Sequence, residues 1–320
     1  MPKNFVNFLE LNEHIPVAIA VSGGVDSMYL MHWCAKYLKN ATVLTVNHGL
    51  RAVAESETKF VAESAKSLGL KCEILKWVGK KPTCGIEEAA RCARYDLLTN
   101  YCKEHGIGIL LTAHHADDNI ETFLMNLGRG SGVYGLAGIR HEIILGGVRV
   151  VRPMLDISRS EILEYAKKHK IKFVSDEMNE NTDFVRVKIR KSRHLITDKL
   201  GISDARILLA IDSLNRVRED LENQILSKTK KIAENGYKFF VSDLNDLSEE
   251  LQLKLLSMLI QDVGKLSYPP RLQSVQKLLY NVRNRAKMTM TLGRCAIRRL
   301  DDKLLIVPEG TSVSFIKKRK

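Results

Sequence analysis

The stretch that decides the fold is residues 17–27, VAIAVSGGVDS. Residues 17–21 form a short, uncharged apolar run, which is typical of a strand buried on both faces of a parallel sheet. The run ends at Ser22–Gly24, and a helical pattern extends from Met28 to about Leu38. A strand, a glycine turn and a helix N-terminus together present free backbone N–H groups to an anion. The sequence therefore predicts a phosphate-binding loop.

The side chains of this loop indicate how a phosphate would be held. Gly23 and Gly24 allow it to approach the backbone closely, and Ser22 and Ser27 add hydroxyl donors. Asp26 would repel a phosphate, so we expect it to hold Mg²⁺ or to cap the helix. No lysine follows the glycines, so the stretch is not a Walker A loop.

The pattern Ser-Gly-Gly-x-Asp-Ser at residues 22–27 resembles the signature of the pyrophosphate-loop ATPases at every fixed position. The resemblance implies that the chain cleaves ATP between the α and β phosphates, adenylates a substrate and releases pyrophosphate. A glycine turn that only joins a strand to a helix is the alternative. The match follows directly after a buried strand, which favours an ATP site. The predicted nucleotide contacts are Ser22, Gly23, Gly24, Val25, Asp26, Ser27, Asn47 and His48.

Length and composition indicate a globular protein with two domains. At 320 residues the chain exceeds the usual single domain, and 45% apolar residues suffice for a sizeable core. The six cysteines form no Cys-x-x-Cys pair, which is typical of reduced thiols. The N-terminus has no apolar signal core, and no run reaches membrane-spanning length. We therefore predict a cytoplasmic protein with no membrane partner.

The charge distribution predicts a polyanionic partner. The net charge is +13, and the sequence pI is about 9.4. Between Asp262 and Asp301 the chain has no acidic residue but nine basic ones. Solvated surfaces usually mix both signs, so this stretch favours nucleic-acid binding, with Arg283 and Arg285 as predicted RNA contacts. A plain basic surface is the alternative.

Strand and helix patterns alternate through the first part of the chain. Apolar runs at 17–21, 41–48 and 107–113 predict buried strands, and a further strand is predicted at 71–77. This alternation indicates a doubly wound parallel α/β sheet with right-handed crossovers. Ligands bind beyond the carboxyl ends of such strands, so we expect the segments after three strands to meet in one crevice. These segments are 22–27, 47–51 and 114–118.

The second part of the chain predicts a connector and a smaller domain. We assign residues 1–200 to the catalytic domain, including a polar and basic connector from Lys172 onward. Residues 201–320 are predicted to form a basic, mainly helical domain. Helical periodicity begins at Asp204, and two strands are expected near the end of the chain, around Asp301.

Residues 114–122, HHADDNIET, gather ionisable side chains at a predicted strand-to-helix junction. If the helix begins near Asp117, that residue and Glu121 lie one turn apart on the same face. Such carboxylates can bind Mg²⁺, an ammonium group or a proton in transit. Helix capping by the aspartates is the alternative, but it does not account for the two histidines or for Glu121. We therefore predict a catalytic or substrate-binding role for His114, His115, Asp117, Asp118 and Glu121.

Two further groups of polar residues are candidates for nucleotide contacts. After the second strand, Asn47 or His48 would meet the adenosine, and Arg51 would face a phosphate or RNA. A simple strand-exit turn is the alternative. Arg91 and Arg94 lie three residues apart on a predicted helix and so share one side, either as a phosphate clamp or as surface arginines.

With these segments in view, the resemblance narrows to the tRNA(Ile)-lysidine synthetases, which attach lysine to the wobble cytidine of an isoleucine tRNA. The matching segments follow the family's order over about the first three fifths of the chain. They are 22–27, 47–51, 93–95, 114–122, 129–138 and 152–153. The connector keeps Arg186 and Arg190 of the family pattern but departs from it at Glu177, Met178 and Val187. These departures concern the contact with tRNA, not the adenylation.

The resemblance implies a reaction in two steps. Cytidine O2 attacks the α-phosphate of ATP and pyrophosphate leaves, and the lysine ε-amine then displaces AMP at C2. ATP and Mg²⁺ would be the cofactors, and L-lysine and a tRNA(Ile) with a CAU anticodon the partners; the sequence leaves a homodimer open. The implied catalytic residues are Asp26, Arg94, Asp117, Asp118, Glu121 and Arg190, with Asp26 and Asp118 as Mg²⁺ ligands. The predicted lysine or tRNA contacts are Arg51, His114, His115, Arg129 and Arg186, together with Arg283 and Arg285 from the basic stretch.

Two other functions stay open at this point. Thiolation enzymes of the same superfamily act on tRNA, but they usually need reactive or cluster-binding cysteines, commonly Cys-x-x-Cys. The isolated cysteines of this chain disfavour that function. A non-catalytic, ATP-sensing RNA-binding protein is the other alternative, and it would have no use for the carboxylates at 117–121.

Overall fold

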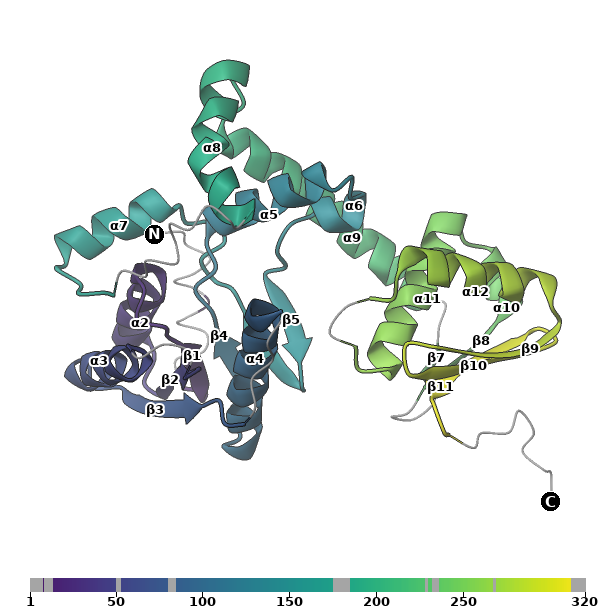
Figure 1. Cartoon of the computed structure of the whole chain (residues 1–320), viewed down its shortest axis with the longest axis horizontal. Helices are drawn as coiled ribbons and strands as arrows, with labels where there is room; N and C mark the ends of the chain where they lie inside the picture. Colours follow the sequence, from purple (N-terminus) through teal and green to yellow (C-terminus); the bar gives the residue numbers. More distant parts are fainter. Residues whose placement is uncertain are drawn as a thin grey trace. The chain divides into compact units, whose positions relative to one another are not determined.

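The chain forms two compact units, residues 1–215 and 216–320. The computed structural model describes residues 8, 14–49, 53–79, 85–174, 185–227, 230–231, 236–266 and 269–311 (Figure 1). The division falls within helix α9 (Asp204–Ser227). The boundary predicted at residue 200 coincides with the end of helix α8 (Val185–Leu200).

The first unit contains a six-stranded sheet in the order β3-β2-β1-β4-β6-β5. Neighbouring strands run parallel except for the antiparallel pair β5–β6. This arrangement confirms the predicted doubly wound α/β sheet. The strands are β1 (Val17–Ala20), β2 (Ala41–Asn47), β3 (Lys71–Lys76), β4 (Ile109–Leu111), β5 (Glu142–Leu145) and β6 (Val148–Val151).

Both faces of the central strand β1 are buried, as its uncharged sequence requires. Val17 and Ile19 belong to an apolar core on one face, and Ala18 belongs to a second core on the other. Successive side chains of a strand point to opposite faces, so every residue of β1 packs against apolar neighbours. Residues of α2 (Val25–Tyr37), α3 (Ala54–Ser67) and α7 (Arg159–Lys168) contribute to the first core. Residues of α4 (Ile86–Glu104) contribute to the second, on the opposite side of the sheet (Figure 1).

Helix α5 (Ala116–Gly128) carries the motif 114–122 away from the sheet and packs beside α8. It begins one residue before the predicted start. Its apolar side is buried by α9, since Ile120 packs with Ile207 and Ile211. This apolar contact therefore does not involve the charged side of α5, which carries Asp117, Asp118 and Glu121. The short helix α6 (Val133–Leu136) follows within the glycine-rich segment.

The second unit combines helices with a five-stranded antiparallel sheet, in the order β7-β8-β11-β10-β9. The helices α10 (Val241–Asn245), α11 (Glu249–Val263) and α12 (Leu272–Asn284) share an apolar core with inward-facing strand residues such as Ile297 and Ile306. The strands are β7 (Lys230–Lys231), β8 (Tyr237–Phe240), β9 (Lys287–Leu292), β10 (Cys295–Leu300) and β11 (Lys303–Pro308).

The expected hairpin around Asp301 is present as β10–β11, but the prediction of only two strands was wrong. A further turn at Gly293 and Arg294 separates β9 from β10. Both turn residues have positive φ, 60° and 62°, which is the backbone of a two-residue hairpin. Among the described residues, no helix has the length and apolar composition needed to cross a membrane.

Candidate active site

The loop 22–27 has the backbone of an anion cradle. Gly23 has φ +92°, which favours glycine, and its carbonyl accepts a hydrogen bond of 2.9 Å from the Val174 N–H. The Ser27 hydroxyl donates to the Gly24 carbonyl (2.9 Å) and accepts from the Ser22 N–H (3.2 Å). These bonds fix the loop without using the N–H groups of the first turn of α2, which have no partner within the helix. The loop therefore fits a phosphate.

Helix α2 begins earlier than predicted, at Val25 rather than Met28. Its N-cap residue is Gly24, which has no side chain that could accept a hydrogen bond from the first turn. The alternative that Asp26 caps the helix was therefore wrong. Asp26 instead lies in the first turn. Its Oδ1 is buried and has no hydrogen-bond partner among the described residues. A buried acceptor without a partner is costly unless a ligand or ion satisfies it.

His115 lies at the centre of three carboxylates and is only 2% exposed. Its Nε2 lies 3.7 Å from Asp26 Oδ1 and 3.6 Å from Asp118 Oδ2, and its Nδ1 lies 3.8 Å from Asp117 Oδ2. Burial lowers the pKa of His115, but the nearby carboxylate of Asp26 and the negative charges of Asp118 and Asp117 outweigh it, so that the pKa is raised. The imidazole therefore balances negative charge at this point.

Asp26 and Asp118 border the same imidazole nitrogen and so lie within a small common volume. Two carboxylates and substrate phosphate oxygens are a usual ligand set for Mg²⁺. In the described parts of the chain, no group of three or more His, Cys, Asp or Glu residues is arranged to hold a metal ion. The residues present thus fit a Mg²⁺ ion that takes its other ligands from substrate and water, but not a cage made by the protein alone.

Glu121 is held by two arginines of α8. Its side chain is 0% exposed, and Arg190 Nε and Nη2 donate to its two oxygens at 2.7 and 3.2 Å. Arg186 Nε lies 3.2 Å from Glu121 Oε2, and Arg186 Nη2 donates to the Thr122 hydroxyl at 2.9 Å. The bond with Glu121 also raises the pKa of Arg190. Both Glu121 oxygens are therefore committed to the α5–α8 packing.

Asp117 is equally committed, through a third arginine of the same helix face. Its Oδ1 accepts a hydrogen bond of 2.6 Å from Arg193 Nη2, and its Oδ2 accepts one of 2.7 Å from the Arg159 N–H at the start of α7. Burial raises the pKa of Asp117, but these two hydrogen bonds outweigh it and hold the pKa below its usual range. Arg193 Nη2 also donates to Asp204 Oδ2 at 3.0 Å.

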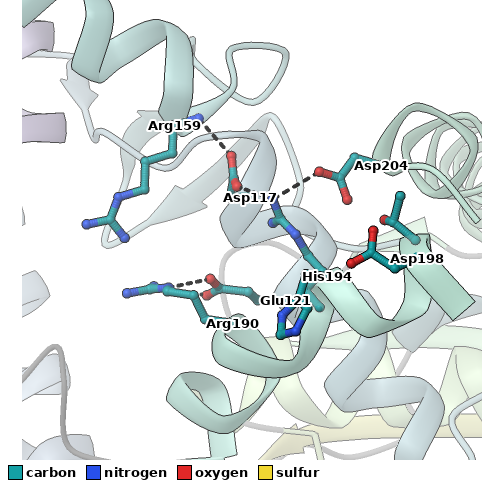
Figure 2. Close-up of a pocket in the computed structure, with 9 residues that line it drawn as sticks. Asp117, Glu121, Arg159, Arg190, His194, Asp198 and Asp204 are labelled. Carbon is teal, nitrogen blue, oxygen red and sulfur yellow. Dashed lines mark hydrogen bonds and ion pairs between the residues drawn. The ribbon is translucent and has the colours of Figure 1, made fainter.

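A cavity of about 370 Å³ opens beside this network in the first unit (Figure 2). Carboxylates and basic side chains alternate around it, and the dashed lines in Figure 2 mark the bonds of Asp117 and Glu121. Its lining residues are Asp117, Glu121, Arg159, Arg190, Arg193, His194, Thr197, Asp198 and Asp204. The volume and the mixed charge suit a small zwitterionic ligand.

His114 lies among arginines rather than among carboxylates. Burial and the charges of Arg152, Arg94, Arg91 and Arg186 lower its pKa well below the usual value, and its Nδ1 lies 3.0 Å from the Thr112 hydroxyl. A neutral histidine surrounded by guanidinium groups marks a positive region, which favours an anion. The predicted residues Arg94 and Arg186, together with Arg91, thus lie close enough for their charges to act on His114.

The remaining predicted contacts lie at the end of β2, at the end of α5, or outside the described residues. Asn47 Oδ1 accepts a hydrogen bond of 2.8 Å from the Gly49 N–H, and the His48 ring lies edge-on to Trp77, with centroids 6.1 Å apart. Arg129 is exposed at the C-terminus of α5. Arg51, like Glu177 and Met178 of the connector, lies outside the described residues.

In the second unit, Arg283 and Arg285 differ from each other. The Arg283 guanidinium is bound to Glu249 Oε2 at 2.7 Å and to Gln252 Oε1 at 2.8 Å. Arg285 is exposed, and its side chain has no hydrogen bond or ion pair among the described residues. The predicted RNA contact is thus directly accessible for Arg285, whereas Arg283 stabilises the packing of α11 and α12.

Sequence reasoning did not include Arg152, Arg193 and Asp204 among the site residues. Arg152 directly follows β6, so the strand-end argument applied to the other strands would have found it. Arg193 shares a helix face with Arg186 and Arg190 by its spacing of three and seven residues, which was visible in the sequence. Asp204 had no such signal, because only the packing of α9 brings it to Arg193.

The loop, the doubly wound sheet and a family model agree on the class of protein. Residues 1–196 match the model of the PP-loop domain, which places the chain among the PP-loop enzymes, which use ATP. Among solved structures, the U34-tRNA thiolase NcsA from Methanococcus maripaludis shares this fold, with a TM-score of 0.54 at 18% identity over 69% of this chain and 79% of that one.

Curated relatives narrow the family. The tRNA(Ile)-lysidine synthase of Wolbachia pipientis wMel is 34% identical over 314 residues, or 94% of this chain and 72% of the relative. That of Orientia tsutsugamushi (strain Boryong) is 33% identical over 309 residues, or 92% of this chain and 70% of the relative. The chain belongs to the tRNA(Ile)-lysidine synthase family. This confirms the family predicted from the sequence.

Proposed function

We propose that this enzyme ligates L-lysine to C2 of the wobble cytidine of a tRNA(Ile) with a CAU anticodon, with release of AMP and pyrophosphate. The observation that carries the proposal is the meeting of the phosphate loop, His115 and the carboxylates of Asp26 and Asp118 at one edge of the sheet. Asp26 Oδ1 has no hydrogen-bond partner among the described residues, whereas Asp118 Oδ2 caps α5 by accepting the His115 N–H at 3.1 Å. Adenylation requires such a cradle for pyrophosphate beside groups that control charge at the α-phosphate.

The first step would use the positive region around His114. When cytidine O2 attacks the α-phosphate, negative charge increases on the phosphate oxygens, and guanidinium groups already in place stabilise it without reorganisation. Arg94 and Arg91 are the arginines of α4 that act on His114, and Arg152 is a third. Asp26 and Asp118 would hold Mg²⁺, which neutralises phosphate charge when it is bound.

The second step needs a lysine whose ε-amine is neutral and whose α-groups are held. We assign the 370 Å³ cavity to this lysine. Glu121 and Asp117 border the cavity, but their oxygens are engaged with arginines, whereas Asp198 is exposed there and Asp204 Oδ1 has no hydrogen-bond partner among the described residues. Asp198 and Asp204 are therefore the carboxylates we propose for the lysine α-ammonium group, and Glu121 acts by holding Arg186 and Arg190.

The tRNA would be held in part by the basic second unit. Arg285 and Lys287 are exposed within the segment that contains no acidic residue. Contacts of this type supply affinity through the phosphate backbone and weaken with salt. We place the protein in the cytoplasm with its tRNA. The sequence leaves a homodimer open, and light scattering on the purified protein would measure the oligomeric state.

The proposal is tested with purified protein, unmodified tRNA(Ile) and α-labelled ATP. Thin-layer chromatography should show AMP and no ADP, and mass spectrometry of digested tRNA should show a lysine adduct on one cytidine. Arginine in place of lysine should give little product, because its guanidinium stays protonated. Sulfur on a nucleoside would favour the thiolation alternative, and ADP as the product would contradict the assignment altogether.

A further inference from the structure

Asp117 makes contacts that a ligand-binding carboxylate would not make. Both of its oxygens accept short hydrogen bonds from the protein, 2.6 Å from Arg193 Nη2 and 2.7 Å from the Arg159 N–H. Its side chain is only 14% exposed. A metal ion or a substrate ammonium would have to share the acceptors that already hold Arg193 and the Arg159 N–H. Asp117 therefore acts as a bracket: its two hydrogen bonds, to the Arg159 N–H and to Arg193, connect α5 with α7 and with α8.

The bracket extends to a fourth helix through Arg193. The same Nη2 that donates to Asp117 also donates to Asp204 Oδ2 at 3.0 Å, and Asp204 is the first residue of α9. A guanidinium between two carboxylates is restrained from both sides, so its position is better defined than that of an arginine with one partner. Asp204 thus orients Arg193, and Arg193 orients Asp117.

We propose that Arg193 and Asp204 are positioning residues for the reaction, acting through Asp117. Asp117 is the second residue of α5; His115, two residues before it, borders Asp26, and Asp118, directly after it, borders the same imidazole nitrogen. The Arg193 bridge thereby fixes the turn of α5 that places these groups beside the phosphate loop. The role in catalysis rests on the proposed function, whereas the bracket itself is a property of the fold.

The kinetic test compares Arg193→Gln and Asp204→Asn with Glu164→Gln. Glu164 is exposed on α7 and does not line the cavity, so it controls for loss of a negative charge near the bracket. We expect kcat for AMP release to fall roughly tenfold in the first two variants, with the KM for ATP little changed, because a small displacement of reacting groups is costly. Arg193→Lys should restore part of the rate, and Glu164→Gln should leave kcat unchanged.

A second readout does not depend on activity. Asp117 accepts the Arg159 N–H, so loss of Arg193 should increase hydrogen–deuterium exchange at the start of α7, while exchange at α3 stays the same. The double variant should show no further loss beyond Arg193→Gln alone, because both residues act through one contact.

The outcomes separate this inference from the proposed function. If the unsubstituted enzyme forms no lysine adduct, the proposed function fails, but the exchange experiment still decides whether the bracket exists. The inference is overturned if exchange at Arg159 is unchanged in Arg193→Gln. It is also overturned if Asp204→Asn raises the KM for lysine at unchanged kcat, which would make Asp204 a substrate contact only. A third contradicting result would be that Glu164→Gln lowers kcat as much as Asp204→Asn.

Discussion

The phosphate loop and the α5–α8 junction both contain acidic residues, but they use them in opposite ways. Glu121 in the junction is completely buried, and its oxygens are bound by Arg190 and Arg186. Asp26 in the loop has a side chain that is 30% exposed and an Oδ1 without a hydrogen-bond partner among the described residues. Saturated acceptors hold a structure together, whereas an unsatisfied acceptor is available to a ligand. The comparison therefore separates residues for stability from residues for chemistry.

The largest expected effect is on activity at the open carboxylate. Asp26→Asn removes the charge beside the phosphate loop, and we expect AMP release to fall at least about a thousandfold, as for other groups that act on the reacting charge. The free energy of unfolding should change by less than about 0.5 kcal/mol, since no hydrogen bond is lost. Steady-state kinetics and urea unfolding check both parts. A loss of stability of several kcal/mol would contradict the comparison.

The saturated carboxylate should give the reverse balance. Glu121→Gln keeps the volume but removes the charge that two arginines face, and we expect a loss of about 2 kcal/mol of unfolding free energy, less than for a fully buried pair because the arginines are partly exposed. Urea midpoints measure this loss. Activity should also fall, because Arg186 and Arg190 lose their anchor.

A matched control for Glu121 exists on the β5–β6 hairpin. Glu142 binds Arg149 with two hydrogen bonds of 2.8 Å, but the pair is 40–48% exposed. Glu142→Gln should therefore cost less than about 0.5 kcal/mol. If Glu121→Gln and Glu142→Gln lower the free energy of unfolding by the same amount, burial does not determine how much these ion pairs contribute to stability.

The same contrast explains what the sequence could and could not predict. The loop 22–27 and the carboxyl ends of the strands depend on local pattern and on the general topology of doubly wound sheets, and both were predicted. Which oxygen of Asp117 is occupied depends on Arg193, which lies 76 residues away along the chain. A residue type and its spacing indicate that a carboxylate is present, but not whether its acceptors are already used.

The second unit shows the corresponding limit for the fold. The residues from Met288 to Val307 were predicted as one pair of strands around Asp301, but the structure divides the part before Asp301 into β9 and β10. The turn at Gly293 and Arg294 is only two residues long, and Arg294 is not a typical residue for positive φ. Short strands such as β8 have too few residues for a period of two to be recognised.

The open-versus-saturated distinction also applies to the arginines predicted to contact RNA. Arg285→Glu should weaken tRNA binding several-fold and reduce the slope of log affinity against log salt by roughly one, while ATP binding is unchanged. Arg283→Glu should mainly lower the melting temperature, because it places a negative charge against Glu249. Filter binding at several salt concentrations and thermal unfolding distinguish the two. If Arg283→Glu and Arg285→Glu give the same salt slope and the same stability, the distinction does not hold here.

A modest effect on stability is expected from the acid dependence of Asp117. Its pKa is held below the usual value in the folded state, so the carboxylate stabilises the fold above its unfolded pKa of about 4, and this contribution is lost as the pH falls through the folded value. The Asp117→Asn variant has no carboxylate at this position, so it lacks this pH-dependent stabilisation at every pH. We therefore expect the variant to be less stable than the unsubstituted protein by roughly 1 kcal/mol at pH 6, with the difference shrinking toward pH 3. Urea midpoints between pH 3 and pH 6 measure it, with Asp198→Asn as the exposed control. A difference that stays constant down to pH 3 would show that the two hydrogen bonds to Asp117 do not depend on its charge.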